Sequence, residues 1–142
     1  MRKYLLALAL VAAPAMAAGD IVMHRDPGCG CCEAWAAQVA KAFGQSVKIV
    51  DEPDRASLHK RLGMQPALAS CHTALIDGIA FEGHVPIADM KRVLATRPAG
   101  VTGLAVPGMP IGSLGMEVPG RGSVRYTVIA FGPAKASVFA QR

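Results

Sequence analysis

Three cysteines within four residues, Cys29-Gly30-Cys31-Cys32, are the strongest chemical signal in the sequence. Cys29 and Cys32 have the C-x-x-C spacing of a redox dithiol, in which a helix N-terminus stabilises the first thiolate. Cys29 and Cys31 have the C-x-C spacing of a metal chelate. A plain disulfide would suit an oxidising compartment, but a single pair of cysteines would be enough for it. The crowding of three thiols therefore favours a redox dithiol or a metal-binding thiolate site.

A fourth thiol, Cys71, lies in the segment Ser70-Cys71-His72-Thr73, which follows Pro66. In a thioredoxin-like fold the proline-bearing segment before this strand lies beside the cysteine loop, so we expect all four sulfurs to converge. Cys31 and Cys32 are adjacent, and adjacent side chains on a helix project about 100° apart. That geometry suits the bridging of several metal ions better than the enclosure of one tetrahedral ion. The cysteines thus predict a polynuclear thiolate site.

Two methionines, Met109 and Met116, lie on an apolar loop and indicate which metal the thiolates would bind. Thiolates bind both zinc and copper, whereas thioether and thiolate together form the soft donor set that favours Cu(I). Filling gaps in a core is the commoner role of methionine. Both interpretations stay open for these two residues.

Two histidines could complete the metal shell through neutral imidazole. His84 is the better candidate because it lies in a loop, which is where binding residues are often found. His72 follows Cys71 on a predicted strand, and strand alternation would turn the two side chains to opposite faces. His72 therefore fits a hydrogen-bonded core position nearly as well as a ligand position. We expect His59, on a predicted helix face, to be solvated.

Residues 1–17 have the pattern of a cleaved export signal: a basic start at Arg2-Lys3, an apolar run, and an A-x-A site that ends at Ala17. The run is well short of the roughly 20 residues needed to span a bilayer, and no later apolar stretch is uninterrupted. Removal of Arg2 and Lys3 lowers the formal net charge from +5 to +3, which argues against nucleic-acid binding. We expect residues 18–142 to form a single periplasmic domain without a membrane span.

The elements of that domain follow from periodicity and turn residues. Strands are predicted at 20–24, 47–50, 68–76, 79–82, 124–131 and 136–139, and helices from Cys32 to Gly44, at 54–62 and at 86–96. This order predicts a thioredoxin-like α/β sandwich with a central mixed sheet. Residues 98–123 contain 7 glycines and 4 prolines, so we expect a long loop, which is apolar enough to pack over the domain.

Taken together, these residues closely resemble the CopG-type periplasmic copper-binding proteins, the domain-of-unknown-function four-eleven family. The resemblance rests on Asp26-Pro-x-Cys-Gly-Cys-Cys32, Ser70-Cys-His-Thr73, Asp77-Gly78, Glu82-Gly-His-Val-Pro86, Pro107-Gly-Met-Pro110 and Gly115-Met-Glu117. It implies a thioredoxin-like domain that binds copper as a thiolate cluster. The implied ligands are Cys29, Cys31, Cys32 and Cys71, followed by His72, His84, Met109 and Met116. Leu114 departs from the family pattern, in which proline is common, and would loosen the approach to Met116.

The leading hypothesis is a periplasmic copper-binding protein that sequesters or relays Cu(I) and contributes to copper resistance. Its partners would be copper ions and other periplasmic copper-handling proteins, and copper reduction could be coupled to thiol oxidation. The alternative is a metal-free thiol-disulfide oxidoreductase that uses Cys29 and Cys32. A structural zinc site is the weakest hypothesis because of the methionine loop. The sequence has no P-loop, G-x-S-x-G or H-E-x-x-H motif, so no other enzyme class is predicted.

Overall fold

The computed structural model describes residues 20–142, and the predicted export signal at 1–17 lies outside them. The strands are β1 (Ile21–Arg25), β2 (Val47–Asp51), β3 (His72–Ile76), β4 (Ile79–Glu82), β5 (Gly103–Ala105), β6 (Thr127–Phe131) and β7 (Ser137–Gln141). The helices are α1 (Gly30–Phe43), α2 (Ala56–Arg61), a short 3-10 helix (Pro66–Leu68) and α3 (Ile87–Thr96). None of these described helices is long and apolar enough to cross a membrane.

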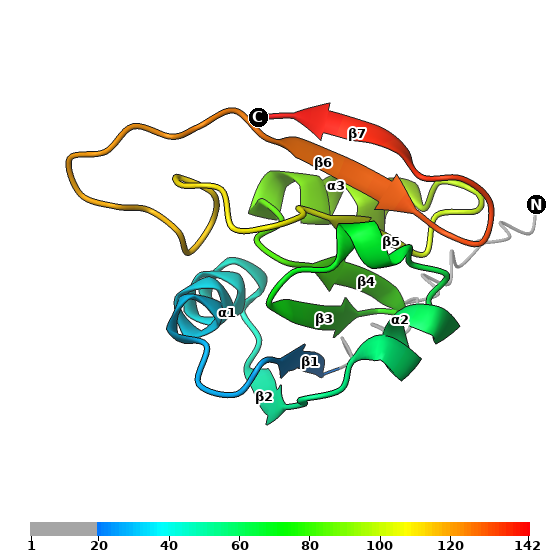
Figure 1. Cartoon of the computed structure of the whole chain (residues 1–142), viewed down its shortest axis with the longest axis horizontal. Coiled ribbons are helices and arrows are strands. Elements are labelled where there is room, and N and C mark those ends of the chain that lie inside the picture. The colour runs from blue at the N-terminus through cyan, green and yellow to red at the C-terminus, as the bar shows by residue number, and fades with distance from the viewer. Residues whose placement is uncertain (1–19) are drawn as a thin grey trace, which may run out of the picture.

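All seven strands form one mixed sheet with the order β2-β1-β3-β4-β5-β6-β7 (Figure 1). β1 pairs in parallel with β2, and β4 pairs in parallel with β5, whereas the other four pairings are antiparallel. The predicted mixed α/β class is therefore confirmed. The thioredoxin-like designation stays a prediction.

The hairpin between β3 and β4 is the one that the sequence predicts at Asp77-Gly78. Ile76 pairs with Ile79, so the loop has two residues, and both adopt positive φ, 47° at Asp77 and 78° at Gly78. Two positive φ values match the right-handed twist of the flanking strands. The hairpin fixes β4 beside β3 and so brings Glu82 opposite Thr73.

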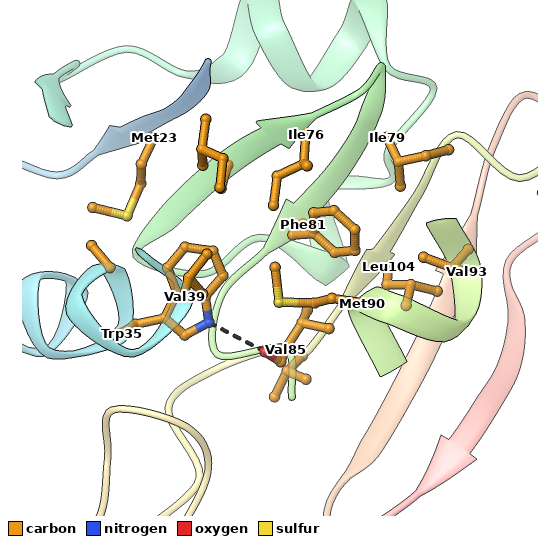
Figure 2. Packing of buried hydrophobic residues seen from close by; sticks show 14 of the residues in the cluster. Met23, Trp35, Val39, Ile76, Ile79, Phe81, Val85, Met90, Val93 and Leu104 are labelled. Carbon is orange, nitrogen blue, oxygen red and sulfur yellow. Dashed lines mark hydrogen bonds between the residues drawn. The ribbon is translucent and has the colours of Figure 1, made fainter. Parts of the chain in front are cut away.

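The main core lies between the sheet and the helices α1 and α3. Trp35 and Val39 of α1 are completely buried and pack in one cluster with Phe81 of β4 (Figure 2). Trp35 Nε1 donates a hydrogen bond of 3.2 Å to the Val85 carbonyl, which satisfies the one polar atom of the indole ring. The predicted apolar face of α1 is thus confirmed, and it holds the start of the helix rigidly against the sheet.

A smaller apolar cluster lies on the other face of the sheet, which the 3-10 helix and the residues around it cover. Met64 and Leu68 pack there against Ala80, Ala105 and Phe131. α2 itself buries no apolar side chain. This face instead contains buried charged groups, which are described with the candidate site.

Asp89 in the first turn of α3 is a charged residue that is completely buried. Its carboxylate accepts hydrogen bonds from both Arg142 Nε, at 2.9 Å, and Arg142 Nη2. Arg92 Nη2 lies 3.4 Å from the same carboxylate. Arg142 follows β7 directly, so this ion pair joins the C-terminal hairpin to α3.

The segment at 98–123 is mostly irregular, as predicted, but it contains the short strand β5. β5 was not predicted from the sequence because three residues, one of them glycine, are too few to show an alternating pattern. Leu104, Ala105 and Val106 are completely buried, so the expected packing against the domain is confirmed for this part. The part that follows β5, drawn in yellow to orange, extends at the α1 side of the sheet (Figure 1).

Candidate metal centre

The cysteine loop joins β1 to α1, and Arg25 holds it in place. Cys29 is the N-cap of α1 and has an extended backbone, with φ −71° and ψ 97°. Arg25 Nη1 donates a hydrogen bond of 3.0 Å to the Cys29 carbonyl. The same guanidinium forms ion pairs of 2.7 Å with both Glu33 of α1 and Asp51 of β2. Three elements are therefore tied together around the loop.

The four cysteine sulfurs converge, as the sequence predicts. Their sulfur atoms all lie within 4.8 Å of one another. Cys29 and Cys32 are joined by a disulfide, whereas Cys31 and Cys71 are free thiols. Cys29 Sγ lies 3.4 Å from Cys31 Sγ. The C-x-x-C pair and the two remaining thiols therefore occupy a single site.

The disulfide bears on how the site could bind a metal. A thiolate is the metal-binding form of cysteine, and the bonded sulfurs of Cys29 and Cys32 carry no such charge. Of the four cysteines, only Cys31 and Cys71 can supply a thiolate in this state. A four-thiolate site therefore requires reduction of the Cys29–Cys32 bond by two electrons.

Cys71 brings the fourth sulfur from the opposite side of the site. It lies in a bend just before β3, not within the strand. Its Sγ is 3.5 Å from His72 Nδ1 and 3.3 Å from His84 Nε2. The expectation that alternation turns His72 away from Cys71 is therefore wrong, because alternation begins only at His72. Burial first, and then the neighbouring Cys31, raise the pKa of the Cys71 thiol to about 11.

His84 is oriented by a backbone contact. Its Nδ1 lies 2.8 Å from the Leu114 carbonyl oxygen. Because a carbonyl oxygen only accepts, Nδ1 carries the proton, and the lone pair of Nε2 is directed at Cys71 Sγ. Burial lowers the pKa of His84, so the ring is neutral at physiological pH. A neutral imidazole whose other nitrogen donates to a carbonyl is the usual arrangement of a histidine ligand.

His72 is buried between aromatic rings. Its ring centroid lies 4.5 Å from that of Trp35 and 5.2 Å from that of His84. Burial, the largest cause, lowers the pKa of His72 to about 3. Among the described residues, its Nε2 has no hydrogen-bond partner. Cys71, His72 and His84 each offer one ligand atom within 4.8 Å of the others, so the geometry fits His72 both as a ligand and as a packing residue.

The two methionines of the loop differ in their relation to the cysteines. Met109 Sδ lies 3.9 Å from Cys31 Sγ, and the residue as a whole is 53% exposed. The neighbouring Gly108 carbonyl accepts a 2.6 Å hydrogen bond from Ser70 Oγ, which ties this part of the loop to the residue before Cys71. Met116 is half-buried on the same loop, and the described contacts of the cysteine sulfurs do not include it. The structure therefore places Met109, but not Met116, against the cluster.

Leu114 and Gly115 hold the loop between the two methionines against α1. Leu114 packs against the main core and offers its carbonyl to His84. Gly115 has φ +82°, and a Cβ at this position would lie 2.7 Å from the backbone nitrogen of Trp35. Only glycine allows so close an approach to the helix.

Sequence reasoning missed the polar residues behind the cysteine cluster. Arg55 and Glu82 form an ion pair of 3.1 Å on the α2 face of the sheet, and Glu82 is completely buried. His59 contacts the same group, with its Nε2 3.3 Å from Glu82 Oε2 and its side chain only 13% exposed. The expectation of a solvated His59 is therefore wrong. A charged residue at the end of the apolar strand β4, next to the Gly-His-Val-Pro motif, was the available signal for Glu82.

Comparison with known proteins identifies the class of this domain. A family model described as a protein of unknown function, DUF411, matches residues 68–116, the segment from Leu68 to Met116. No curated protein gives a significant match.

Two solved structures are similar over almost their full length. One, titled "Copper resistance protein copG- Form 1", has a TM-score of 0.76 and 41% identity, and the match covers 87% of this chain and 96% of that one. The other, titled "Copper resistance protein copG- Form 2", has a TM-score of 0.75 and 41% identity, with coverage of 87% and 97%. The chain therefore belongs to the CopG copper-resistance family.

Proposed function

We propose that this protein binds Cu(I) as cargo in a multi-cysteine thiolate site, and that it sequesters or relays the metal as part of copper resistance. The observation that supports this most directly is the convergence of four cysteine sulfurs within 4.8 Å. The copper-resistance relatives support the choice of metal.

The donor set fits monovalent copper. Thiolate, thioether and imidazole are the ligands that Cu(I) prefers, and the Met109 thioether and the His84 Nε2 lone pair border the sulfurs. Cys31 and Cys32 lie on consecutive helical positions, which favours bridging of several ions over enclosure of one. Cys29 and Cys32 become ligands only after reduction of their disulfide.

We place this function in the periplasm. The support is the pattern of residues 1–17, with a basic start, a short apolar run and an A-x-A site. A disulfide among the site cysteines is consistent with an oxidising compartment. Other copper-handling proteins of that compartment would be the partners in a relay.

Anaerobic titration of the reduced chain over residues 18–142 with Cu(I), in competition with a chelator, tests the proposal. Bound copper and free thiols are counted together. We expect several copper ions per chain with all four thiols protected, and loss of most binding in Cys29→Ser and Cys31→Ser. Met64→Leu, a volume-conserving change in the other cluster, is the matched control and should bind as the wild type does. Unchanged copper stoichiometry in the cysteine variants would refute the proposal.

A metal-free thiol-disulfide oxidoreductase is the second candidate, because the Cys29–Cys32 disulfide lies at the start of α1, where a thiolate is stabilised. Catalysed disulfide exchange without metal would support it.

The two functions can also be coupled. Oxidation of the Cys29 and Cys32 thiols to the disulfide releases two electrons and two protons, which is enough to reduce two Cu(II) ions to Cu(I).

We expect the apparent Cu(I) affinity of the reduced protein to increase with pH, because burial raises the pKa of the Cys71 thiol to about 11. Below that pH, copper displaces the Cys71 proton, which contributes about a tenfold gain in affinity per pH unit. The stability of the metal-free protein should depend on pH in the opposite direction. The unfolded chain ionises Cys71 near its ordinary pKa of 9.0, whereas the folded chain keeps the proton up to a pH of about 11, so the free energy of unfolding falls between these two values.

Competition titrations between about pH 6 and 9, a range that lies below the raised pKa of Cys71, measure how Cu(I) affinity changes with pH. Cys71→Ser should release one proton fewer on binding than the wild type. An equal slope in both proteins would contradict the role of the Cys71 proton.

The Met109 thioether should contribute to affinity more than the Met116 thioether, because only Met109 approaches a cysteine sulfur. We expect Met109→Leu to weaken Cu(I) binding by about tenfold, within the range seen when groups around a metal site are removed. Met109 is exposed, so its replacement should leave the unfolding temperature unchanged. Met116→Leu is the matched control on the same loop, and a larger effect of Met116→Leu would contradict this assignment.

A further inference from the structure

A buried ion pair lies behind the cysteine cluster, on the α2 face of the sheet. Glu82 of β4 is completely buried, and the Arg55 side chain is only 7% exposed. Arg55 Nη1 donates to Glu82 Oε1 at 3.1 Å. The desolvation of two buried charges offsets most of their attraction, so such a pair contributes little net stability. Its contacts point instead to a role at the cysteine cluster.

Both charges of the pair hold the residue that precedes Cys71. The Ser70 backbone N–H donates to Glu82 Oε1 at 2.6 Å, and the Ser70 carbonyl accepts from Arg55 Nη2 at 2.5 Å. On the other side of Cys71, Thr73 Oγ1 donates to Glu82 Oε2 at 2.5 Å. One carboxylate thus holds the backbone N–H of Ser70 and the side-chain hydroxyl of Thr73, on either side of Cys71.

The same guanidinium also reaches the cysteine loop. Arg55 Nη2 donates to Asp26 Oδ1 at 3.0 Å, and the Asp26 N–H donates to the Cys71 carbonyl, also at 3.0 Å. Asp26 directly follows β1, three residues before Cys29. Arg55 therefore links the two segments whose sulfurs form the cluster.

Close packing leaves little room for this arrangement to shift. A Cβ on Gly83, which has φ +68°, would lie 2.6 Å from Ser70 Oγ. Ser70 Oγ in turn donates to the Gly108 carbonyl of the Met109 loop. Ser70 is therefore held through its N–H, its carbonyl and its hydroxyl.

We infer that Arg55 and Glu82 are positioning residues that fix the Cys71 sulfur against Cys31 and the cysteine loop. The link to copper rests on the proposed function, whereas the positioning itself is a property of the metal-free protein. A constellation of ligands is held in a productive geometry when the surrounding contacts are themselves locked. The pair performs that role from the face of the sheet opposite to His72 and Trp35.

A trivalent arsenical tests the positioning without copper. With the Cys29–Cys32 disulfide intact, phenylarsine oxide can bridge the free thiols of Cys31 and Cys71. Two As–S bonds form, the arsenic–oxygen bond breaks, the two thiol protons leave with that oxygen as water, and no redox change occurs. The affinity of this bridge depends on how the two sulfurs are held.

We expect Glu82→Gln and Arg55→Met to weaken arsenical bridging by about tenfold or more, as removal of a group behind a metal site does. Arg55→Lys, which keeps the charge, should recover part of the loss. Asp89→Asn is the matched control, because Asp89 is also a completely buried carboxylate paired with arginine. It should lower the unfolding temperature and leave bridging unchanged. Wild-type bridging in all Arg55 and Glu82 variants, or an equal loss in Asp89→Asn, would overturn the inference.

A milder variant keeps the test decisive if Glu82→Gln does not fold. The Asp26 side chain is 54% exposed, so Asp26→Asn should fold normally and weaken only the link to the cysteine loop. Reduced bridging at an unchanged unfolding temperature supports the inference, and wild-type bridging in both Asp26→Asn and Arg55→Lys opposes it.

Cu(I) affinity should follow the same order across the variants. A wild-type protein that binds no copper would refute the proposed function, while the arsenical result would still decide the positioning role.

Discussion

Cys71→Ser should lower the Cu(I) affinity of the reduced protein by about a hundredfold or more, a loss expected when a ligand and the contacts that it organises disappear together. Cys71 carries the sulfur that lies against both His72 and His84. Without this sulfur, the thiolates of the cysteine loop remain on one side of the site. The imidazoles of His72 and His84 remain on the other, and no thiolate connects the two groups of ligands. The expected result is a smaller number of copper ions, each held more weakly.

Competition against a chelator of known affinity measures this effect, with copper and protein quantified in each fraction. Serine is close to cysteine in size, so the metal-free variant should unfold within about 1 kcal/mol of the wild type. That comparison separates the loss of a ligand from a loss of structure. Retention of wild-type copper stoichiometry and affinity would exclude Cys71 from the site.

Trp35→Ala should cause the largest loss of stability of any single substitution considered, about 3–5 kcal/mol. The indole is completely buried between the sheet and α1, and its removal leaves a large cavity. The Val85 carbonyl loses its hydrogen-bond partner, and His72 loses one of the two rings that it packs against. Since α1 begins at the cysteine loop, the site should lose its rigid support at the same time.

Denaturant unfolding of the metal-free protein, with the Cys29–Cys32 disulfide kept intact, measures this change in the free energy of unfolding. Val138→Ala is the control, because Val138 is 65% exposed on β7, and surface changes of this kind stay within about 0.5 kcal/mol. Similar values for the two variants would show that Trp35 does not anchor the core.

Much of the fold could be predicted because its elements have clear local signals. The spacing of Trp35 and Val39 predicted the buried face of α1, and Asp77-Gly78 predicted the two-residue hairpin. The strand predicted at 68–76 begins only at His72, because Pro66–Leu68 forms a 3-10 turn. β5 was missed for a similar reason, since its pairing with β4 and β6 depends on contacts distant in sequence.

The site was predictable in its sulfur atoms and less so in the residues around them. Cysteine spacing alone indicated a metal or redox site, and the structure places the Cys71 sulfur beside the other three, as expected. Arg55 could not be assigned in this way, because its partners Asp26, Ser70 and Glu82 are far apart in the sequence. His59 was misjudged because a short helix shows no clear buried face until its neighbours are known.

The ion pair between Asp89 and Arg142 has a consequence for the order in which the chain folds. The two residues are 53 positions apart in the sequence. Contacts within α3 are local and can form early, whereas the Asp89 carboxylate meets Arg142 only when the hairpin of β6 and β7 closes over the helix. Burial of an uncompensated charge is strongly unfavourable. Closure of the C-terminal hairpin over α3 and burial of the Asp89 carboxylate are therefore expected to occur together, as a late step of folding that depends on a contact distant in sequence.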